Sequence, residues 1–176
     1  MRKRLQLVAG AAVAAAALAA GIAVRWDART DRVQAESIAA FTRTELPDLA
    51  GHLTSLERWR GNVVVVNFWA GWCAPCRDEI PGLVRIQQKY AANGLQIVGI
   101  AVDSAAKSRE AANELKISYP VLIGGVETVD LTSTLGNPVG GLPYTVILNR
   151  QGQLVGTHLG ILTERELERL VRPLLG

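Results

Sequence analysis

The sequence of 176 residues is poor in cysteine, histidine and aromatic side chains. It contains two cysteines and two histidines, and aromatic residues make up 5% of it. Two cysteines are too few to hold together a disulfide-rich miniprotein, and two histidines are too few for an ordinary His-rich metal site. Few aromatic residues are present, and no Lys/Arg cluster interleaves with them in the main part of the chain. The sequence therefore also argues against a nucleic-acid-binding surface.

Charged residues are unevenly distributed, and little net charge is left for the main part of the chain. Lys and Arg number 19, and Asp and Glu number 16. Residues 1–32 carry six of the bases and two of the acids, a net charge of +4, so residues 33–176 have a net charge of −1. An apolar content of 49% with 20% charged residues excludes disorder for most of the chain. The basic character therefore belongs to the N-terminal segment.

One long apolar run lies at the N-terminus. Arg2-Lys3-Arg4 precede an Ala-rich segment over residues 5–24, and basic residues before such a segment are typical of an export signal. Its length favours an uncleaved membrane anchor, because a spanning helix needs about 20 residues. Its small residues also fit a cleavage site, so a cleaved signal is the alternative. We expect residues 1–24 to be a signal or membrane anchor and the remainder to lie outside the cytoplasm.

A spacer and one folded domain follow this segment. Residues 25–40 are polar and Ala-rich without a strand pattern, so we expect a spacer with a turn or two of helix. Residues 41–176 have the length of a single domain. No internal repeat is visible in the sequence, so we expect one domain and not an array.

The domain alternates strand and helix patterns, which predicts an α/β fold. Residues 63–68 form a β-branched run typical of a strand buried on both faces of a parallel sheet. A last helix begins with a capping box of Thr163 and Glu166. Its apolar face is expected to comprise Leu167, Leu170, Val171 and Leu174. Further expected elements are strands over 95–102, 119–123, 144–148 and 153–158, helices over 74–92, 104–115 and 127–135, and a small hairpin over 46–56. The layout is a parallel core with one antiparallel hairpin at its end.

The candidate chemistry lies in Cys73-Ala74-Pro75-Cys76, directly after a predicted strand and at the start of a predicted helix. At a helix N-terminus, unpaired N–H groups and the dipole stabilise a thiolate and lower the pKa of Cys73. Cys76 lies one turn on, close enough to form a short disulfide and to attack a mixed disulfide formed at Cys73. A structural disulfide would restrain little of the unfolded chain. A metal site would lack its other ligands. We therefore predict a redox-active pair.

The run over residues 67–81, NFWAGWCAPCRDEIP, resembles the active site of the thioredoxin superfamily. More narrowly, it is similar to the TlpA/ResA-like, membrane-tethered thiol–disulfide oxidoreductases of bacteria. The similarity extends from about Phe41 to the C-terminus and includes GGLPYT at 140–145 and NRQG at 149–152. The resemblance implies a thioredoxin-like fold, with a mixed central sheet flanked by helices, an N-terminal hairpin and a strand–helix insert over 119–135.

The resemblance also implies roles for single residues. Cys73 would be the attacking thiol and Cys76 the resolving one, with no cofactor and no metal. Pro143 matches the family's cis-proline beside the active site, where the bend exposes the backbone of Leu142 for strand-like pairing with a substrate segment. Trp72 flanks the nucleophile and is expected in the rim of the site.

Two polar residues near the motif bear on proton transfer. Glu79 lies three residues after Cys76 on the same helical face, so its carboxylate is expected near the inner sulfur. ResA-like relatives carry an acid at the matching position, where it tunes the thiols. A solvated acid at a helix start, favoured by the dipole, is the alternative. Asn67 stands where thioredoxin proper has a buried Asp. Since Asn cannot titrate, any proton-shuttle role shifts toward Glu79 or water.

By resemblance, the chain reduces disulfides of exported proteins, such as the haem-attachment cysteines of apocytochrome c or the copper-site cysteines of an oxidase. It would be anchored in the inner membrane facing the periplasm, or soluble there after cleavage. It would need a membrane electron donor, because this compartment is oxidising. A disulfide-forming oxidant of the same fold is the alternative, since the direction depends on the reduction potential. Two other functions are disfavoured. A copper metallochaperone would need a His or Met ligand close to the cysteine pair. A peroxidase of the peroxiredoxin type would need Thr in place of Ala70.

Overall fold

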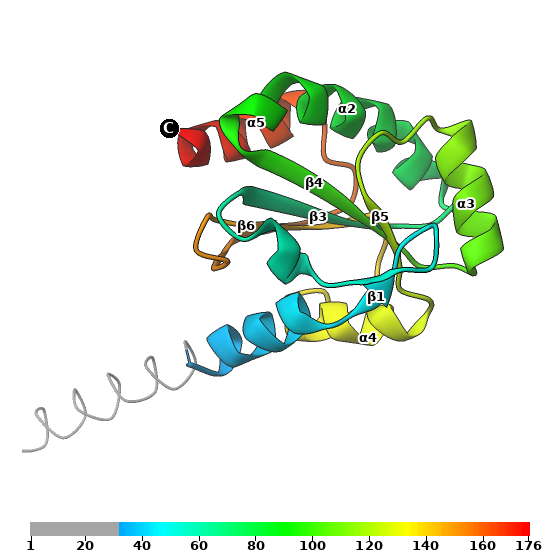
Figure 1. The fold of residues 1–176 in the computed structure, drawn as a ribbon, viewed down its shortest axis with the longest axis horizontal. Coiled ribbons are helices and arrows are strands. Elements are labelled where there is room, and N and C mark those ends of the chain that lie inside the picture. The colour runs from blue at the N-terminus through cyan, green and yellow to red at the C-terminus, as the bar shows by residue number, and fades with distance from the viewer. Residues whose placement is uncertain (1–31) are drawn as a thin grey trace, which may run out of the picture. The chain divides into compact units, whose positions relative to one another are not determined.

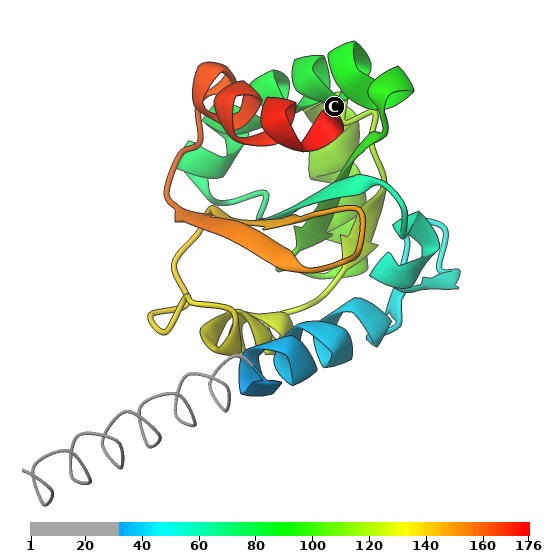
Figure 2. The same ribbon diagram turned by 90° about the vertical axis from the view of Figure 1, so that its left-hand side faces the viewer.

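The computed structural model describes residues 32–176. The expected signal or anchor over residues 1–24 lies outside them, as do residues 25–31 of the expected spacer. A five-stranded mixed sheet forms the centre of the described part, and helices cover both of its faces (Figure 1, Figure 2). The strand order is β5-β4-β3-β6-β7, with β3 (Val63–Trp69), β4 (Leu95–Ala101), β5 (Val121–Ile123), β6 (Tyr144–Leu148) and β7 (Leu154–Leu159).

The strand directions confirm the predicted parallel core with an antiparallel hairpin at its end. β4 pairs parallel with both β3 and β5, whereas β6 and β7 continue the sheet by antiparallel pairing. β5 begins at Val121 and not at Tyr119 as predicted. The intervening Pro120 has no N–H for a ladder bond, although its carbonyl oxygen accepts from the N–H of Gly99 at 2.9 Å.

Four α-helices follow β3 in the described part of the chain: α2 (Ala74–Tyr90), α3 (Ala105–Glu114), α4 (Glu127–Thr134) and α5 (Glu164–Leu175). α2 and α5 cover one face of the sheet, and α4 lies on the other (Figure 1, Figure 2). α3 and α4 agree with their predicted bounds to within one residue. α2 ends at Tyr90, two residues before the predicted end at residue 92, and passes into a 3-10 turn over Ala91–Asn93, which ends at Gly94 in the left-handed conformation.

Both faces of β3 are covered, which explains its continuously apolar sequence. Successive side chains point to opposite faces. Val64 and Phe68 therefore pack in the cluster that includes the end of α4, and Val63 and Val65 pack against α2 and α5. All seven residues of the strand are buried. Asn67, its one polar side chain, alternates with Phe68 and so points toward the face that α2 covers.

The segment ahead of β3 contains the predicted hairpin, formed by β1 (Leu46–Pro47) and β2 (Leu53–Thr54). A helix covers residues 32–43, which is longer than the turn or two expected in the spacer. The compact unit begins at Ser37. The reason is that Ile38, inside the expected spacer, is buried in the same core cluster as Phe41.

α5 differs from its prediction in the face that it buries. The predicted capping box at its start is present. Its buried residues are Leu167, Val171 and Leu175, whereas Leu170 is 42% exposed. The prediction that Leu170 belongs to the buried face was therefore wrong. Residues four positions apart form the narrow stripe that meets the sheet, and Leu170 lies beside that stripe.

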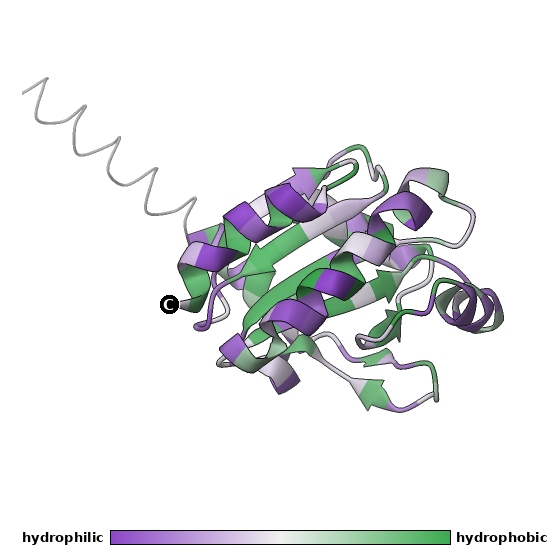
Figure 3. Ribbon diagram, turned by 90° about the horizontal axis from the view of Figure 1, so that it is seen from above, coloured by the Kyte–Doolittle hydropathy of each residue, from purple (hydrophilic) through white to green (hydrophobic). Residues whose placement is uncertain are grey.

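The hydropathy of the elements follows this layered arrangement. Figure 3 shows hydrophobic residues concentrated in the strands and hydrophilic residues on the outward faces of the covering helices. Within residues 32–176, no helix combines the length and the apolar character that crossing a membrane requires.

Candidate active site

The Cys73-Ala74-Pro75-Cys76 motif lies where β3 passes into α2. β3 ends at Trp69, and Cys73 is the N-cap residue of α2. Cys73 Sγ accepts a hydrogen bond from the N–H of Cys76 at 3.3 Å. This bond satisfies one of the N–H groups that the start of a helix leaves without a partner. Pro75 stands in the first turn, where no N–H is needed. The structure thus confirms that the motif opens the helix.

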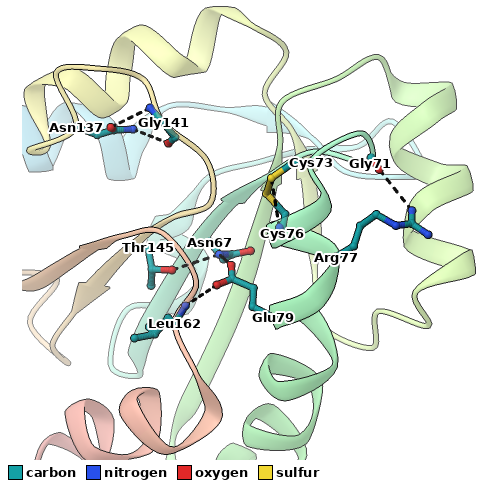
Figure 4. Close-up of a disulfide and its surroundings, with 10 residues drawn as sticks. All are labelled: Asn67, Gly71, Cys73, Cys76, Arg77, Glu79, Asn137, Gly141, Thr145 and Leu162. Atoms are coloured by element: carbon teal, nitrogen blue, oxygen red, sulfur yellow. Dashed lines mark hydrogen bonds between the residues drawn. A yellow bond between two sulfur atoms is a disulfide. The ribbon is translucent and has the colours of Figure 1, made fainter.

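Cys73 and Cys76 form a disulfide (Figure 4). Their Cα atoms are 5.3 Å apart. Cys73 is 6% exposed, whereas Cys76 is 0% exposed. What little surface the pair offers therefore belongs to Cys73.

A buried carboxyl group, that of Glu79, lies further along α2. Glu79 is 4% exposed, so it is not a solvated acid at the helix start. Its Oε1 accepts a hydrogen bond from Asn67 Nδ2 at 2.7 Å, and its Oε2 accepts one from the N–H of Leu162 at 2.8 Å (Figure 4). Burial raises the pKa of this carboxyl group, and the two donors oppose that shift only in part. Glu79 therefore keeps its proton to a higher pH than an exposed glutamate.

Asn67 and Thr145 join this carboxyl group to the sheet, and together with Glu79 and Leu162 they form what we call the Glu79 cluster. Asn67 and Thr145 are register partners on β3 and β6, and Asn67 Nδ2 also donates to Thr145 Oγ1 at 3.2 Å. Asn67 Oδ1 is buried and has no hydrogen-bond partner in the described structure. Rotation of the Asn67 side-chain amide by half a turn would place Oδ1, a hydrogen-bond acceptor, next to the carboxyl group of Glu79. Asn67 can therefore pair with either the charged or the neutral carboxyl group.

The loop before β6 brings a second element to the disulfide. The Leu142–Pro143 bond is cis, as the resemblance implies. Leu142 packs against the cluster of side chains that contains both cysteines. The carbonyl oxygen of Pro143 accepts from the N–H of Gly160 at 2.9 Å, whereas Leu142 makes no backbone hydrogen bond within residues 32–176. Its N–H and C=O are thus available to another chain.

Sequence reasoning missed several residues of the site. The side chain of Asn137 pairs with the backbone of Gly141: Nδ2 donates to the carbonyl oxygen at 3.0 Å, and Oδ1 accepts from the N–H at 3.1 Å (Figure 4). The only signal for it is an Asn after a Gly past a predicted helix, which is an ordinary turn sequence. Thr145 and Leu162 were also missed, because their contacts in the Glu79 cluster span 78 and 83 positions.

Exposed apolar side chains lie next to Cys73 in the chain and beside this loop. We call Trp72, Val139 and Leu159 the apolar rim, since all three are exposed. Trp72 is adjacent to Cys73 in the chain. Leu159 and Val139 flank the loop: a Cβ at Gly141 would lie 2.9 Å from Leu159 Cδ1 and 3.7 Å from Val139 Cγ2. Exposed apolar groups that flank a reactive motif and a neighbouring loop are typical of a surface that binds another molecule.

Arg77 connects the turn before Cys73 to α3. Its Nη1 donates to the carbonyl oxygen of Gly71 at 3.4 Å (Figure 4). The same nitrogen donates to Glu114 Oε2 at 3.2 Å. The same guanidinium holds the pKa of the exposed Glu114 carboxyl group below its usual value. These bonds hold the turn that leads to Cys73 against a neighbouring helix.

Comparison with known proteins identifies the family. Residues 38–157 match the model of the AhpC/TSA family. Thioredoxin-like protein YneN of Bacillus subtilis (strain 168) is 34% identical over 128 residues, which are 70% of this chain and 72% of that protein. Thiol-disulfide oxidoreductase ResA of Geobacillus kaustophilus (strain HTA426) is 29% identical over 171 residues, which are 96% of each chain.

Solved structures with the same fold carry related names. A thiol:disulfide interchange protein of the thioredoxin family from Chlorobium tepidum TLS superposes with a TM-score of 0.68 at 28% identity, over 76% of this chain and 93% of that one. A secreted thiol-disulfide isomerase from Corynebacterium glutamicum superposes with a TM-score of 0.68 at 26% identity, over 75% and 83%. The chain therefore belongs to the AhpC/TSA family, and it is a thiol–disulfide oxidoreductase with a thioredoxin-like fold and a Cys73–Cys76 pair.

Proposed function

We propose that this protein reduces disulfides of exported proteins and holds its substrate as an extended segment beside Leu142–Pro143. The observation that carries the proposal is the position of Leu142. Its backbone N–H and C=O are unpaired, and it packs against the side chains around the disulfide. An extended segment can pair with such a residue, while its nonpolar side chains lie on the apolar rim. This arrangement suits a cystine within a polypeptide.

The reaction starts from the reduced pair, with Cys73 as the thiolate that the N-terminus of α2 favours. The thiolate attacks one sulfur of the substrate disulfide. The substrate S–S bond breaks, a mixed disulfide with Cys73 forms, and the released substrate thiolate takes a proton. Cys76 then loses its proton and attacks the Cys73 sulfur, and the second substrate sulfur leaves as a thiolate and is protonated. The substrate gains two electrons and two protons, and the Cys73–Cys76 disulfide forms.

Glu79 accepts the Cys76 proton in the second step of this scheme. The two residues are three positions apart on α2, so their side chains leave neighbouring points of one helical face. The raised pKa of Glu79 also supports the role, because a base is most effective when its pKa lies near the working pH.

The oxidised pair must be reduced again before a second turnover. In an oxidising compartment this requires a dithiol donor in the membrane. The basic residues and apolar run of 1–24 support attachment to the inner membrane with the domain in the periplasm. Fractionation of cells that produce the full chain should recover it with the inner membrane. A shorter chain in the soluble periplasmic fraction would show instead that the segment is cleaved. The cysteine pairs of apocytochrome c and of oxidase copper sites are the substrate classes that the resemblance favours.

Replacing the resolving cysteine tests the proposal. Cys76→Ser removes the group that displaces the substrate, so we expect the mixed disulfide on Cys73 to accumulate. The full-length variant, produced in cells, should show covalent partners on non-reducing electrophoresis, and mass spectrometry should place the link at Cys73. Cys73→Ser is the matched control and should capture nothing. If Cys76→Ser also captures nothing, or if Cys73→Ser captures partners through Cys76, the proposed turnover is wrong.

A further inference from the structure

Asn137 lies between α4 and the Leu142–Pro143 loop, and its side chain is completely buried. Both halves of its amide pair with one residue: Nδ2 donates to the carbonyl oxygen of Gly141, and Oδ1 accepts from the N–H of Gly141 (Figure 4). The side chain thus pairs with Gly141 as a neighbouring strand would, with one donor and one acceptor. It fixes the position and the orientation of the peptide groups directly before Leu142.

The end of α4 holds Asn137 in turn. The N–H of Asn137 donates to the carbonyl oxygen of Thr132 at 2.9 Å, and its Nδ2 donates to Thr132 Oγ1 at 3.0 Å. A second hydrogen bond to this region lies on the other side of the cis-proline. The hydroxyl of Tyr144 donates to the carbonyl oxygen of Leu135 at 2.7 Å. The loop is therefore bonded to the end of α4 both before and after Leu142–Pro143.

These bonds leave one residue of the loop free to pair. The N–H and C=O of Gly141 are occupied by Asn137, and the carbonyl oxygen of Pro143 is occupied by Gly160. Pro143 has no N–H. Leu142 alone keeps both backbone groups unpaired among Gly141, Leu142 and Pro143. A substrate segment that pairs with this loop therefore has one defined register.

We propose that Asn137 is a positioning residue, which holds Gly141 so that Leu142 presents its N–H and C=O to the substrate. Through it, α4 of the insert sets the substrate-binding loop. This inference rests on the proposed function, because it assigns Asn137 to the binding of a polypeptide disulfide. Loss of the amide loosens the loop and weakens substrate binding, while the chemistry of the cysteine pair is unaffected.

The test compares a peptide substrate with a small one on the reduced full-length protein. The probes are a synthetic peptide with an internal cystine and nonpolar flanking residues, and 5,5′-dithiobis(2-nitrobenzoic acid), which has no backbone to pair. For Asn137→Ala we expect KM for the peptide to rise about 10-fold, the loss of roughly one well-placed hydrogen bond, with kcat within about twofold. The rate with the small disulfide should stay within about twofold of the wild type.

Thr128→Val is the matched control, because Thr128 is a buried hydroxyl of α4 that donates to Gly125 and not to the loop. It should destabilise α4 without changing KM. If Asn137→Ala does not fold, Asn137→Leu, which fills the same volume without an amide, takes its place with the same expected rise.

The outcomes separate this inference from the proposed function. An unchanged KM in the folded variant, or an equal loss of rate with both probes, overturns the role of Asn137 alone. A wild type that reacts with the small disulfide but not with the cystine peptide overturns the proposed function and this inference together. A KM rise of the same size in Thr128→Val would show that any damage to α4 has this effect, and it would also overturn the role of Asn137.

Discussion

At the scale of single residues, the buried carboxyl group of Glu79 couples proton uptake to folding. Two N–H groups, from Asn67 and Leu162, donate to it, but it has almost no contact with water. Desolvation favours the neutral form and raises the pKa of the carboxyl group. In the unfolded chain the same group has the ordinary pKa of a glutamate. The folded state therefore holds the proton to a higher pH, and protonation of Glu79 stabilises the fold.

We expect Glu79→Gln to remove part of the pH dependence of stability. In the wild type, the contribution from Glu79 is fully present below the ordinary pKa of Glu and declines as the pH rises through the raised folded value. Gln does not titrate, so the stability of the wild type relative to the variant should fall as the pH is raised across that window. Urea unfolding of both proteins at a series of pH values from acid to neutral measures this difference.

Glu114→Gln provides a control of the opposite sign. Arg77 lowers the pKa of the exposed Glu114, so any stability from that carboxylate is present above its ordinary pKa and is lost as the pH falls. Parallel stability curves for the wild type and Glu79→Gln would contradict a titrating carboxyl group in the core.

At the scale of elements, the start of α5 positions one member of the Glu79 cluster. Thr163, the N-cap of α5, directly follows Leu162, whose N–H donates to Glu79. Thr163 Oγ1 accepts from the N–H of Glu166 at 3.4 Å, and the N–H of Thr163 donates to Glu166 Oε2 at 3.1 Å. The capping box thus fixes the chain direction at the residue that reaches the buried carboxyl group.

We expect Thr163→Ala to lower the free energy of unfolding by about 1 kcal/mol, the usual loss when an N-cap side chain is removed. Urea unfolding near neutral pH measures the change. Ser104→Ala is the matched control, because Ser104 is the N-cap of α3 but its side chain makes no capping hydrogen bond. Its effect should stay within about 0.5 kcal/mol. Equal losses in the two variants would show that the capping box adds nothing to stability.

Local sequence patterns predict the positions of helices and strands better than they predict which side chains are buried. The β-branched run of β3 and the capping box of α5 act within a few residues, so the sequence alone predicted where those elements lie. The buried face of α5 was not predicted correctly. Leu170 and Ile38 are both apolar, and the sheet decides that Ile38 is buried and Leu170 is 42% exposed. The periodicity of apolar residues indicates which faces of a helix could be buried, and tertiary packing selects one of those faces.

At the scale of the whole molecule, the reduction potential decides the direction of the reaction, because it measures the free-energy difference between the oxidised and reduced folded proteins. A reductant of exported proteins should have a potential of about −270 mV or below, close to that of thioredoxin. Equilibration of the full chain with dithiol–disulfide buffers, followed by quantification of reduced Cys73 and Cys76, measures it. A value near about −120 mV would instead make the protein a disulfide-forming oxidant.

The redox pair, its place at a helix start after a buried strand, and the mixed α/β layout could all be predicted from the sequence. All three follow from interactions between residues close together in the chain. The tertiary structure alone decided which groups meet around that pair. It buried Glu79 with Asn67 and Leu162, and it paired Asn137 with the loop that carries Leu142. These partners are polar residues without periodic spacing, and only the path of the folded chain brings together the donors and acceptors that burial requires to be paired.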